Sequence, residues 1–134
     1  MLQKLILESP LFNDDPVRPH ISAEFRTTGN RTALALNDNS AVICCAMCAD
    51  VPVSEKDLDK PGDVAVFYTV WSYKKGAGRD IVFKAIEWAK ENTTPSRFVT
   101  LSPKTEMARR FHIKNGAFEL QENSDTINYE YKDV

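Results

Sequence analysis

The feature that most constrains the fold is a succession of buried strand, glycine turn and amphipathic helix in the middle of the chain. Val64–Trp71 is a run of apolar, β-branched and aromatic residues, which is typical of a central strand buried on both faces. The turn Ser72–Gly78 follows, and apolar side chains then recur at helical spacing from Ile81 to about Glu91. A second apolar run, Phe98–Leu101, comes after the helix. Because strands joined by a helical crossover are parallel, this order predicts a right-handed strand–helix–strand unit at the centre of a sheet.

The segments before this unit predict an antiparallel meander. Ile21–Arg26 alternates apolar with polar residues, which is the period of a half-buried strand. Thr32–Leu36 and Ala41–Val51 predict two further strands, separated by a tight turn at Asn37–Asn39. The opening Leu2–Leu7 has apolar residues at helical spacing and predicts one short helix.

The segments after the crossover predict a helix and a strand pair. We expect a helix over Glu106–Lys114 that ends in a left-handed cap at Asn115-Gly116. Ala117–Gln121 and Thr126–Tyr131 then predict two antiparallel strands. The predicted fold class is therefore α/β, with a mixed and mostly antiparallel sheet. The 134 residues contain no repeat and no long linker, so they predict a single domain over residues 1–134.

The three cysteines, Cys44, Cys45 and Cys48, lie within one apolar run. A disulfide framework uses an even number of cysteines spread along the chain, and the two histidines complete no zinc-binding pattern. We therefore expect reduced thiols buried on a core strand, no metal site and a cytoplasmic location. No apolar run approaches the roughly 18 residues of a membrane span, so no membrane association is expected.

Charge is distributed unevenly along the chain. The net charge of −2 argues against nucleic-acid binding. Residues 73–114 hold ten Lys or Arg and four Asp or Glu, whereas the rest of the chain holds seven basic and fifteen acidic residues. The basic part would suit a polyanionic small ligand, and the acidic part could attract a cationic acceptor. A solvated surface with neither role explains both parts equally well.

The turn between the central strand and the helix carries the strongest chemical signal. In Gly76-Ala77-Gly78, the glycines allow a sharp turn and a close approach of a ligand to backbone amides. The amides and partial positive charge of a helix N-terminus bind phosphate, and Lys74, Lys75 and Arg79 could add charge pairing. The turn is neither a P-loop nor a dinucleotide fingerprint, because it lacks the required GK[ST] and third glycine.

Two motifs at a characteristic separation resemble those of one family. Tyr73–Gly78 aligns with Q/R-x-x-G-x-G/A, which precedes that family's long helix, and Ala108–Phe118 looks like A-x-x-x-Y-x-K-x-G-F. Ile127–Tyr131 resembles the family's last strand. On these residues, roughly Ala41–Tyr131 is similar to the GCN5-related N-acetyltransferase (GNAT) superfamily. The chain departs from the family pattern in three ways. Tyr73 stands in place of Gln or Arg, with a strand-to-glycine connection about two residues short; His112 replaces the usual tyrosine; and the N-terminal part is abbreviated, with one short helix where the family has two.

The resemblance implies an N-acyltransferase that moves an acyl group from acyl-CoA, with acetyl-CoA as the expected cosubstrate, to an amine by direct attack in a ternary complex. The pantetheine arm is expected along the free edge of the central strand, the pyrophosphate on the turn, and the thioester carbonyl near a backbone amide at Phe67–Tyr68. The cofactor-binding residues implied are Val70, Trp71, Ser72, Lys74, Lys75, Gly76, Ala77, Gly78 and Arg79.

The resemblance leaves the proton-transfer residues open. His112 occupies the position of the tyrosine that is thought to protonate the departing CoA thiolate, and it could act as the general acid. Tyr68 and Tyr73 are alternative donors, and Glu24 and Glu106 are candidate bases. An inactive CoA-binding or protein-interaction module with the same fold is the alternative function. The acceptor could be a small amine or a protein amine, and a homodimer is left open.

Overall fold

Strand β4 (Val64–Ser72) lies at the centre of the sheet in the computed structural model, which describes residues 2–134. The other strands are β1 Leu2–Lys4, β2 Arg31–Leu36, β3 Ala41–Cys48, β5 Arg97–Thr100, β6 Ser102–Pro103, β7 Phe118–Glu122 and β8 Thr126–Tyr131. Their order in the sheet is β1-β2-β3-β4-β5-β8-β6, and β7 pairs with β8 outside this path. Only β4 and β5 pair in parallel among these strands, so the predicted mixed, mostly antiparallel α/β fold is confirmed.

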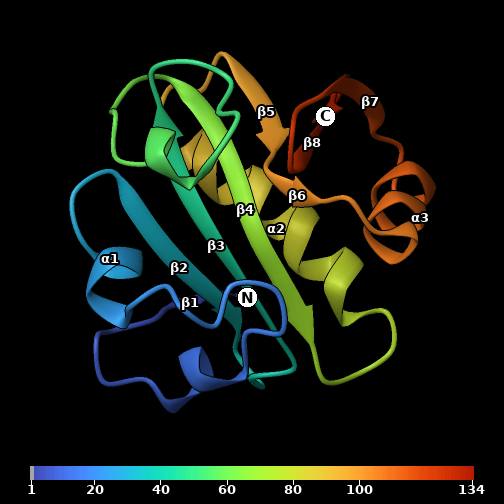
Figure 1. The fold of residues 1–134 in the computed structure, drawn as a ribbon. Helices are drawn as coiled ribbons and strands as arrows, with labels where there is room; N and C mark the ends of the chain where they lie inside the picture. Colours follow the sequence, from blue (N-terminus) through green and yellow to red (C-terminus); the bar gives the residue numbers. More distant parts are fainter. Residues whose placement is uncertain (1) are drawn as a thin grey trace.

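Helices cover both faces of this sheet (Figure 1). Their bounds are η1 Pro10–Asp14, α1 Ala23–Thr27, η2 Glu55–Asp57, α2 Ala77–Asn92 and α3 Glu106–Lys114, where η denotes a 3-10 helix. The apolar side of α2 packs on one face and forms one core cluster with β3, β4 and β8. The N-terminal segment, η1 and α1 pack on the opposite face and form the second cluster. Alternate side chains of β4 enter the two clusters, which explains its uniformly apolar sequence.

The predicted crossover and the predicted helix after it are confirmed. Helix α2 joins the parallel strands β4 and β5, and it begins at Ala77, earlier than the predicted Ile81. Helix α3 has the predicted bounds, and Gly116 follows it with a φ of 99°. A positive φ is the conformation that glycine adopts without steric cost, so this residue ends the helix. Strand β3 ends at Cys48, three residues before the predicted Val51.

The N-terminal helix predicted over Leu2–Leu7 is wrong. Leu2–Lys4 forms the edge strand β1, which pairs antiparallel with β2. Leu5 is then buried, whereas Ile6 and Leu7 are 66% and 51% exposed, so a helical apolar face does not exist here. Six residues are too few for a helix to be stable on local preferences alone, and pairing with a neighbouring strand prevails.

The strand predicted over Ile21–Arg26 is also wrong, because a short helix occupies this segment. The hydroxyl of Ser22 caps α1 by accepting a hydrogen bond from the amide of Phe25 at 3.1 Å. Arg26, which the alternating pattern assigned to the polar face, is fully buried. The abbreviated N-terminal part of the domain therefore contains one α-helix, at Ala23–Thr27.

A buried ion pair fixes this N-terminal part to the sheet. The guanidinium of Arg26 donates to the carboxylate of Asp15 at 2.7 Å, and both side chains have no exposed surface. The same carboxylate accepts hydrogen bonds from the amides of Val17 and Arg18 and from the hydroxyl of Thr69 on β4. Burial raises the pKa of Asp15, but these donors and the charge of Arg26 outweigh burial, and the pKa is below its ordinary value.

The three cysteines are buried and free, as predicted. Burial raises the pKa of the Cys44 and Cys48 thiols to about 11, so both are inert thiols at neutral pH. Across residues 2–134, no helix has the length and apolar character that a bilayer-spanning segment requires.

The variant Asp15→Asn tests the ion pair. Because the substitution leaves a buried guanidinium uncompensated, we expect the free energy of unfolding at pH 7 to fall by about 3–5 kcal/mol. The depressed pKa of Asp15 means that its contribution is complete above the ordinary carboxyl pKa and is lost as the pH falls through the lower folded-state value. Urea unfolding of wild type and variant should therefore differ most above about pH 4 and converge only as the pH falls below the lowered folded-state pKa of Asp15. The exposed Asp59→Asn is the control, and an equal loss in both variants would contradict the assignment.

Candidate functional site

The site is organised by the point at which β4 and β5 separate. Their parallel pairing ends with Phe67 opposite Thr100. At the same point β4 contains a bulge, because Cys44 pairs with Thr69 and Cys45 with Phe67, which leaves Tyr68 as an extra residue. From Tyr68 onward, β4 has no partner strand on this side within the described chain.

Side chains satisfy two carbonyls at this separation. The carbonyl of Tyr68 accepts a hydrogen bond from Nη1 of Arg18 at 2.5 Å. The carbonyl of Thr100 accepts one from Nδ2 of the fully buried Asn128 at 2.7 Å. The amide of Tyr73 donates to Ser40 on the β3 side, so strand alternation turns the backbone groups of Val70 and Ser72 toward the open side. This edge can therefore accept an extended ligand as an added strand.

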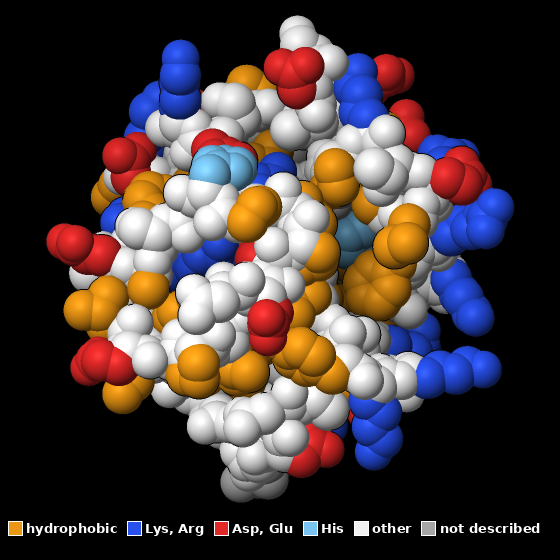
Figure 2. Space-filling model, turned by 60° about the horizontal axis from the view of Figure 1, so that its bottom comes forward, with side chains coloured by type: hydrophobic (Ala, Val, Ile, Leu, Met, Phe, Trp, Pro, Cys, Tyr) orange, Lys and Arg blue, Asp and Glu red, His pale blue; other side chains and the backbone are white. Residues whose placement is uncertain are grey.

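A cavity of about 320 Å³ lies along this free edge, between β4 and α3. Its walls come from three parts of the chain: Pro16 and Val17, residues 67–72 of β4 with Gly78, and the segment that contributes Leu101, Ser102, Pro103, Thr105, Met107, Ala108, Phe111 and His112. Figure 2 shows a hollow bordered by hydrophobic side chains, with a recessed histidine ring in it and Lys and Arg side chains along the neighbouring rim. The walls carry no Lys, Arg, Asp or Glu side chain.

His112 lies on α3 and is held by two tyrosines of β8. Its ring stacks on Tyr129 with 5.2 Å between centroids, and its Nδ1 lies 2.8 Å from the hydroxyl of Tyr131. Burial lowers the pKa of His112 to about 4, so the imidazole is neutral at pH 7. A general acid must carry a proton, and this lowered pKa disfavours the protonated ring at pH 7. The structure places this residue in the cavity wall, as the motif suggested.

Of the alternative proton donors, Tyr68 lines the cavity but has its ring in the core, and Tyr73 does not line the cavity. The ring of Tyr68 points into the second core cluster against Phe25, on the face of the sheet opposite α2. Its buried hydroxyl has no hydrogen-bond partner among residues 2–134. Burial raises the pKa of Tyr68 far above its ordinary value, which makes it a weaker acid. The hydroxyl of Tyr73 accepts from the indole of Trp71 and donates to Asp14, so it joins the end of β4 to the N-terminal segment.

The two candidate bases do not line the cavity. Glu24 is exposed on α1, and Glu106 pairs with Arg110 on the outer side of α3.

The glycine turn leads from the free edge of β4 to the N-terminus of α2. Gly76 has a φ of 84° and open space where a side chain would lie. The amides of Gly78 and Arg79 have no backbone acceptor in the described part of the chain, whereas that of Ala77 donates to Lys74. Lys74 and Lys75 are exposed beside them. These groups together can bind a phosphate.

Gly78 has a packing role that the sequence did not indicate. A Cβ atom at this position would lie 3.1 Å from Cε1 of Phe111 on α3. The absence of a side chain therefore lets α2 and α3 approach each other at the cavity. Arg79 also contacts the α3 region, because its Nη1 donates to Oδ1 of Asn115 at 3.1 Å.

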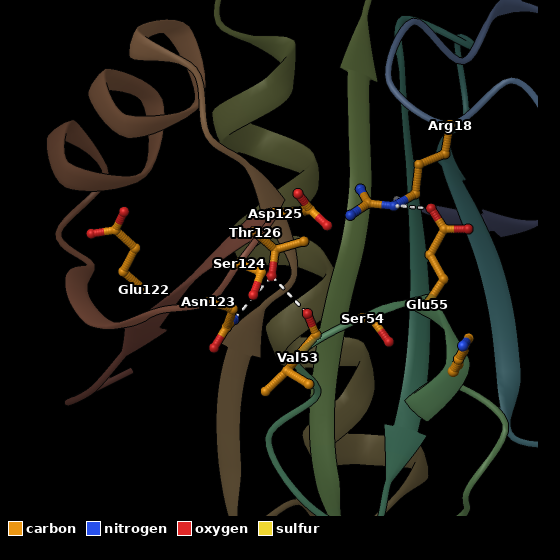
Figure 3. A pocket seen from close by; sticks show the side chains of 10 residues that line it. Arg18, Val53, Ser54, Glu55, Glu122, Asn123, Ser124, Asp125 and Thr126 are labelled. Atoms are coloured by element: carbon orange, nitrogen blue, oxygen red, sulfur yellow. Dashed lines mark hydrogen bonds and ion pairs between the residues drawn. The ribbon is translucent and has the colours of Figure 1, made fainter.

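A second hollow, which sequence reasoning missed, lies beside the same separation. It is a groove of about 830 Å³ lined by Arg18, by the loop Val53–Lys56 and by Glu122–Thr126 at the β7–β8 turn (Figure 3). The hydroxyl of Thr126 donates to the carbonyl of Val53 at 2.8 Å, which ties the two loops together. Three segments far apart in the chain form this groove, so no local pattern could have identified it.

Comparisons with solved structures define the fold of this chain. Similar structures include malonyl-CoA decarboxylase from Cupriavidus metallidurans, with a TM-score of 0.71, 15% identity, and coverage of 98% of this chain and 60% of that one. A putative GNAT acetyltransferase from Desulfovibrio desulfuricans has a TM-score of 0.66 and 13% identity, with 98% and 97% coverage. Arabidopsis thaliana NAA60 in complex with acetyl-CoA has a TM-score of 0.63 and 10% identity, with 98% and 97% coverage.

These likenesses confirm the predicted resemblance at the level of the fold. The chain has the mixed α/β fold of the GNAT acetyltransferases. It spans 60% and 34% of the lengths of two malonyl-CoA decarboxylases with the same fold, one from Cupriavidus metallidurans and one from Rhodopseudomonas palustris. No protein-family model and no curated protein matches the sequence.

The protonation state of His112 is directly measurable. We expect its ¹⁵N imidazole signals to remain those of a neutral ring from pH 8 down to pH 5, because burial lowers its pKa to about 4. The variant His20→Gln removes the signals of the other histidine and makes the assignment unambiguous. A midpoint near pH 6.5 would show that the ring is open to solvent.

Proposed function

We propose that the protein is an acyl-CoA-dependent N-acyltransferase that transfers a small acyl group to an amine. The observation that carries this proposal is the stretch of β4 from Tyr68 to Ser72, which has no partner strand on the β5 side among the described residues. It runs along the cavity from a bulge at one end to the open, glycine-containing N-terminus of α2 at the other. An extended thioester with a phosphate group at its far end matches both features.

The residues that would hold acetyl-CoA fall into two groups. Val70 and Ser72 offer backbone groups to the pantetheine arm, and the Gly78 and Arg79 amides, with Lys74 and Lys75, offer positive charge to the pyrophosphate. The orphaned amides and the open space at Gly76 fit such a ligand. The bound cosubstrate supplies an acyl group activated as a thioester.

Transfer forms a carbon–nitrogen bond and breaks the acyl carbon–sulfur bond. The amine nitrogen loses one proton, and the sulfur of CoA gains one. Only about one His112 ring in a thousand is protonated at pH 7 when its pKa is about 4, so it is a poor proton source. We infer that Tyr131 donates to Nδ1, which leaves the ring proton on Nε2. That N–H then stabilises negative charge on the departing sulfur by a hydrogen bond.

The nature of the cavity wall favours an uncharged acyl group. Because no Lys or Arg side chain lines the cavity, the carboxylate of a malonyl group would be buried without a partner. Acetyl-CoA therefore fits better than malonyl-CoA, which is the substrate in the name of two proteins of similar fold. A CoA-binding module without activity remains the alternative, and an assay of transfer distinguishes the two.

Charge reversal at the glycine turn tests the cofactor site. We expect Lys74→Glu/Lys75→Glu to weaken acetyl-CoA binding, measured by calorimetry, at least about tenfold at low ionic strength, and by less in 0.5 M salt because the effect is electrostatic. Both side chains are exposed, so the fold should be retained. Lys4→Glu/Lys60→Glu changes the net charge equally at a distance from the turn and serves as the control. Equal affinity in both double variants would exclude the turn as the phosphate site.

Substitution of His112 tests its part in transfer. His112→Phe should lower kcat about 100-fold, with the Kd for acetyl-CoA changed by less than about threefold. His112→Gln, which retains an N–H donor, should keep more than about a tenth of the wild-type kcat. Because the neutral ring is the active form, kcat should not fall through this group as the pH rises from 6 to 8. Full activity of His112→Phe would remove His112 from the mechanism.

A further inference from the structure

A nearly buried arginine faces the groove on the N-terminal side of the β4–β5 separation. The side chain of Arg18 is only 5% exposed, yet it lines this groove. Figure 3 shows its guanidinium pointing from the N-terminal segment into the groove, toward the loop that carries Asp125 and Thr126. The preceding residues, Pro16 and Val17, line the cavity of the free edge. Arg18 therefore lies where the two hollows adjoin.

The hydrogen bonds of this guanidinium leave donors unused. Its Nε donates to Oε2 of Glu55 at 3.0 Å, and its Nη1 donates to the carbonyl of Tyr68 at 2.5 Å. Its Nη2 has no partner among residues 2–134. A guanidinium carries five N–H donors and cannot lose its charge. Nη2 is not among the fully buried polar atoms that lack a partner, so it is open to the groove that Arg18 lines. A group that enters the groove and accepts hydrogen bonds would complete this set.

We propose that the acceptor of the acyl group is an amine that also carries a carboxylate, as an amino acid does, and that Arg18 binds this carboxylate through Nη2. The proposal rests on the acyltransferase function proposed above. A carboxylate matches the planar guanidinium better than any other common group on a small amine. Because Arg18 is bonded to the carbonyl of the bulge residue Tyr68, a carboxylate held there places an amine one or two carbons away beside the free edge of β4.

The other charges of the groove agree with an acceptor of mixed charge. Glu55 is already paired with Arg18 and His20, and Glu122 is paired with Lys104. Asp125 has no ion pair within the described residues and could face an ammonium group. A polyamine, in contrast, would bring several positive charges against Arg18 and Lys56. A cationic acceptor, which the acidic part of the chain could attract, therefore fits this groove better when it also carries a carboxylate for Arg18.

A carboxylate on the acyl group, as in malonyl-CoA, is a second possible source of a carboxylate that binds Arg18. Arg18 lines the groove and is absent from the cavity wall along β4, where the acyl group is expected. The geometry therefore points to the acceptor as the source of the carboxylate. Malonyl-CoA tested beside acetyl-CoA distinguishes the two sources.

The test compares matched acceptors that differ only in the carboxylate. Release of CoA from acetyl-CoA is measured with each of the twenty amino acids and with its amide. We expect at least one amino acid to exceed its amide about tenfold in kcat/KM, and Arg18→Met to reduce that ratio to about one. The ratio is insensitive to a general loss of activity, and Arg18→Lys, which keeps the charge, should retain part of the preference. The proposal would be overturned if every amide were as good an acceptor as its amino acid, or if Arg18→Met left the ratio of kcat/KM unchanged. It would also be overturned if the protein used malonyl-CoA, lost this use in Arg18→Met, and showed no preference between amino acids and their amides.

Failure of the acyltransferase function gives a different result. In that case acetyl-CoA neither binds nor releases CoA with any acceptor. Binding of a carboxylate can then be detected by NMR, from the change in the ¹⁵Nε chemical shift of Arg18 during titration with N-acetylated amino acids. A saturable change, with a higher affinity in Glu55→Gln, would support the carboxylate site, because the substitution removes a competing partner of Arg18. No shift at millimolar concentration would exclude it.

Discussion

The arrangement of the site depends on the loss of one strand partner. After Phe67 and Thr100, β4 and β5 part, and a bulge at Tyr68 turns β4 away. Unpaired backbone groups in a sheet interior carry an energetic cost, so the separation persists only because other groups satisfy some of them. Asn128 does so for Thr100, and Arg18 does so for Tyr68. What remains open, from Val70 to Ser72, is the edge that we assign to the cosubstrate.

The N-terminal segment completes the site from the opposite face of the sheet. Its position is fixed by Asp15, whose buried carboxylate binds Arg26, two amides of its own loop and the hydroxyl of Thr69. The residues directly after Asp15 then divide between the two hollows, with Val17 in the wall of one and Arg18 in the other. One ion pair in the core thus links the stability of the short N-terminal part to the geometry of both proposed binding sites.

Elements whose pattern reflects burial could be predicted from the sequence, and elements decided by a distant partner could not. The run Val64–Trp71 is apolar because both its faces meet a core cluster, and helix α3 carries its cap residues within the local sequence. Leu2–Leu7 and Ile21–Arg26 were assigned the wrong structure, since pairing with β2 and the burial of Arg26 against Asp15 prevail over their local periodicity. The position of His112 beside the cavity followed from its motif, but its lowered pKa depends on the burial created by α3 and β8.

The sequence alone determined the crossover at the centre of the sheet, the glycine turn at the start of α2 and the resemblance to acyl-CoA-dependent transferases. Each of these rests on local patterns of hydrophobic period and turn residues along the chain, which a sequence shows directly. Only the tertiary structure decided the protonation of His112, the packing role of Gly78 and the groove with Arg18. Each of these depends on contacts between segments separated by tens of residues, and such contacts leave no periodic trace in the sequence.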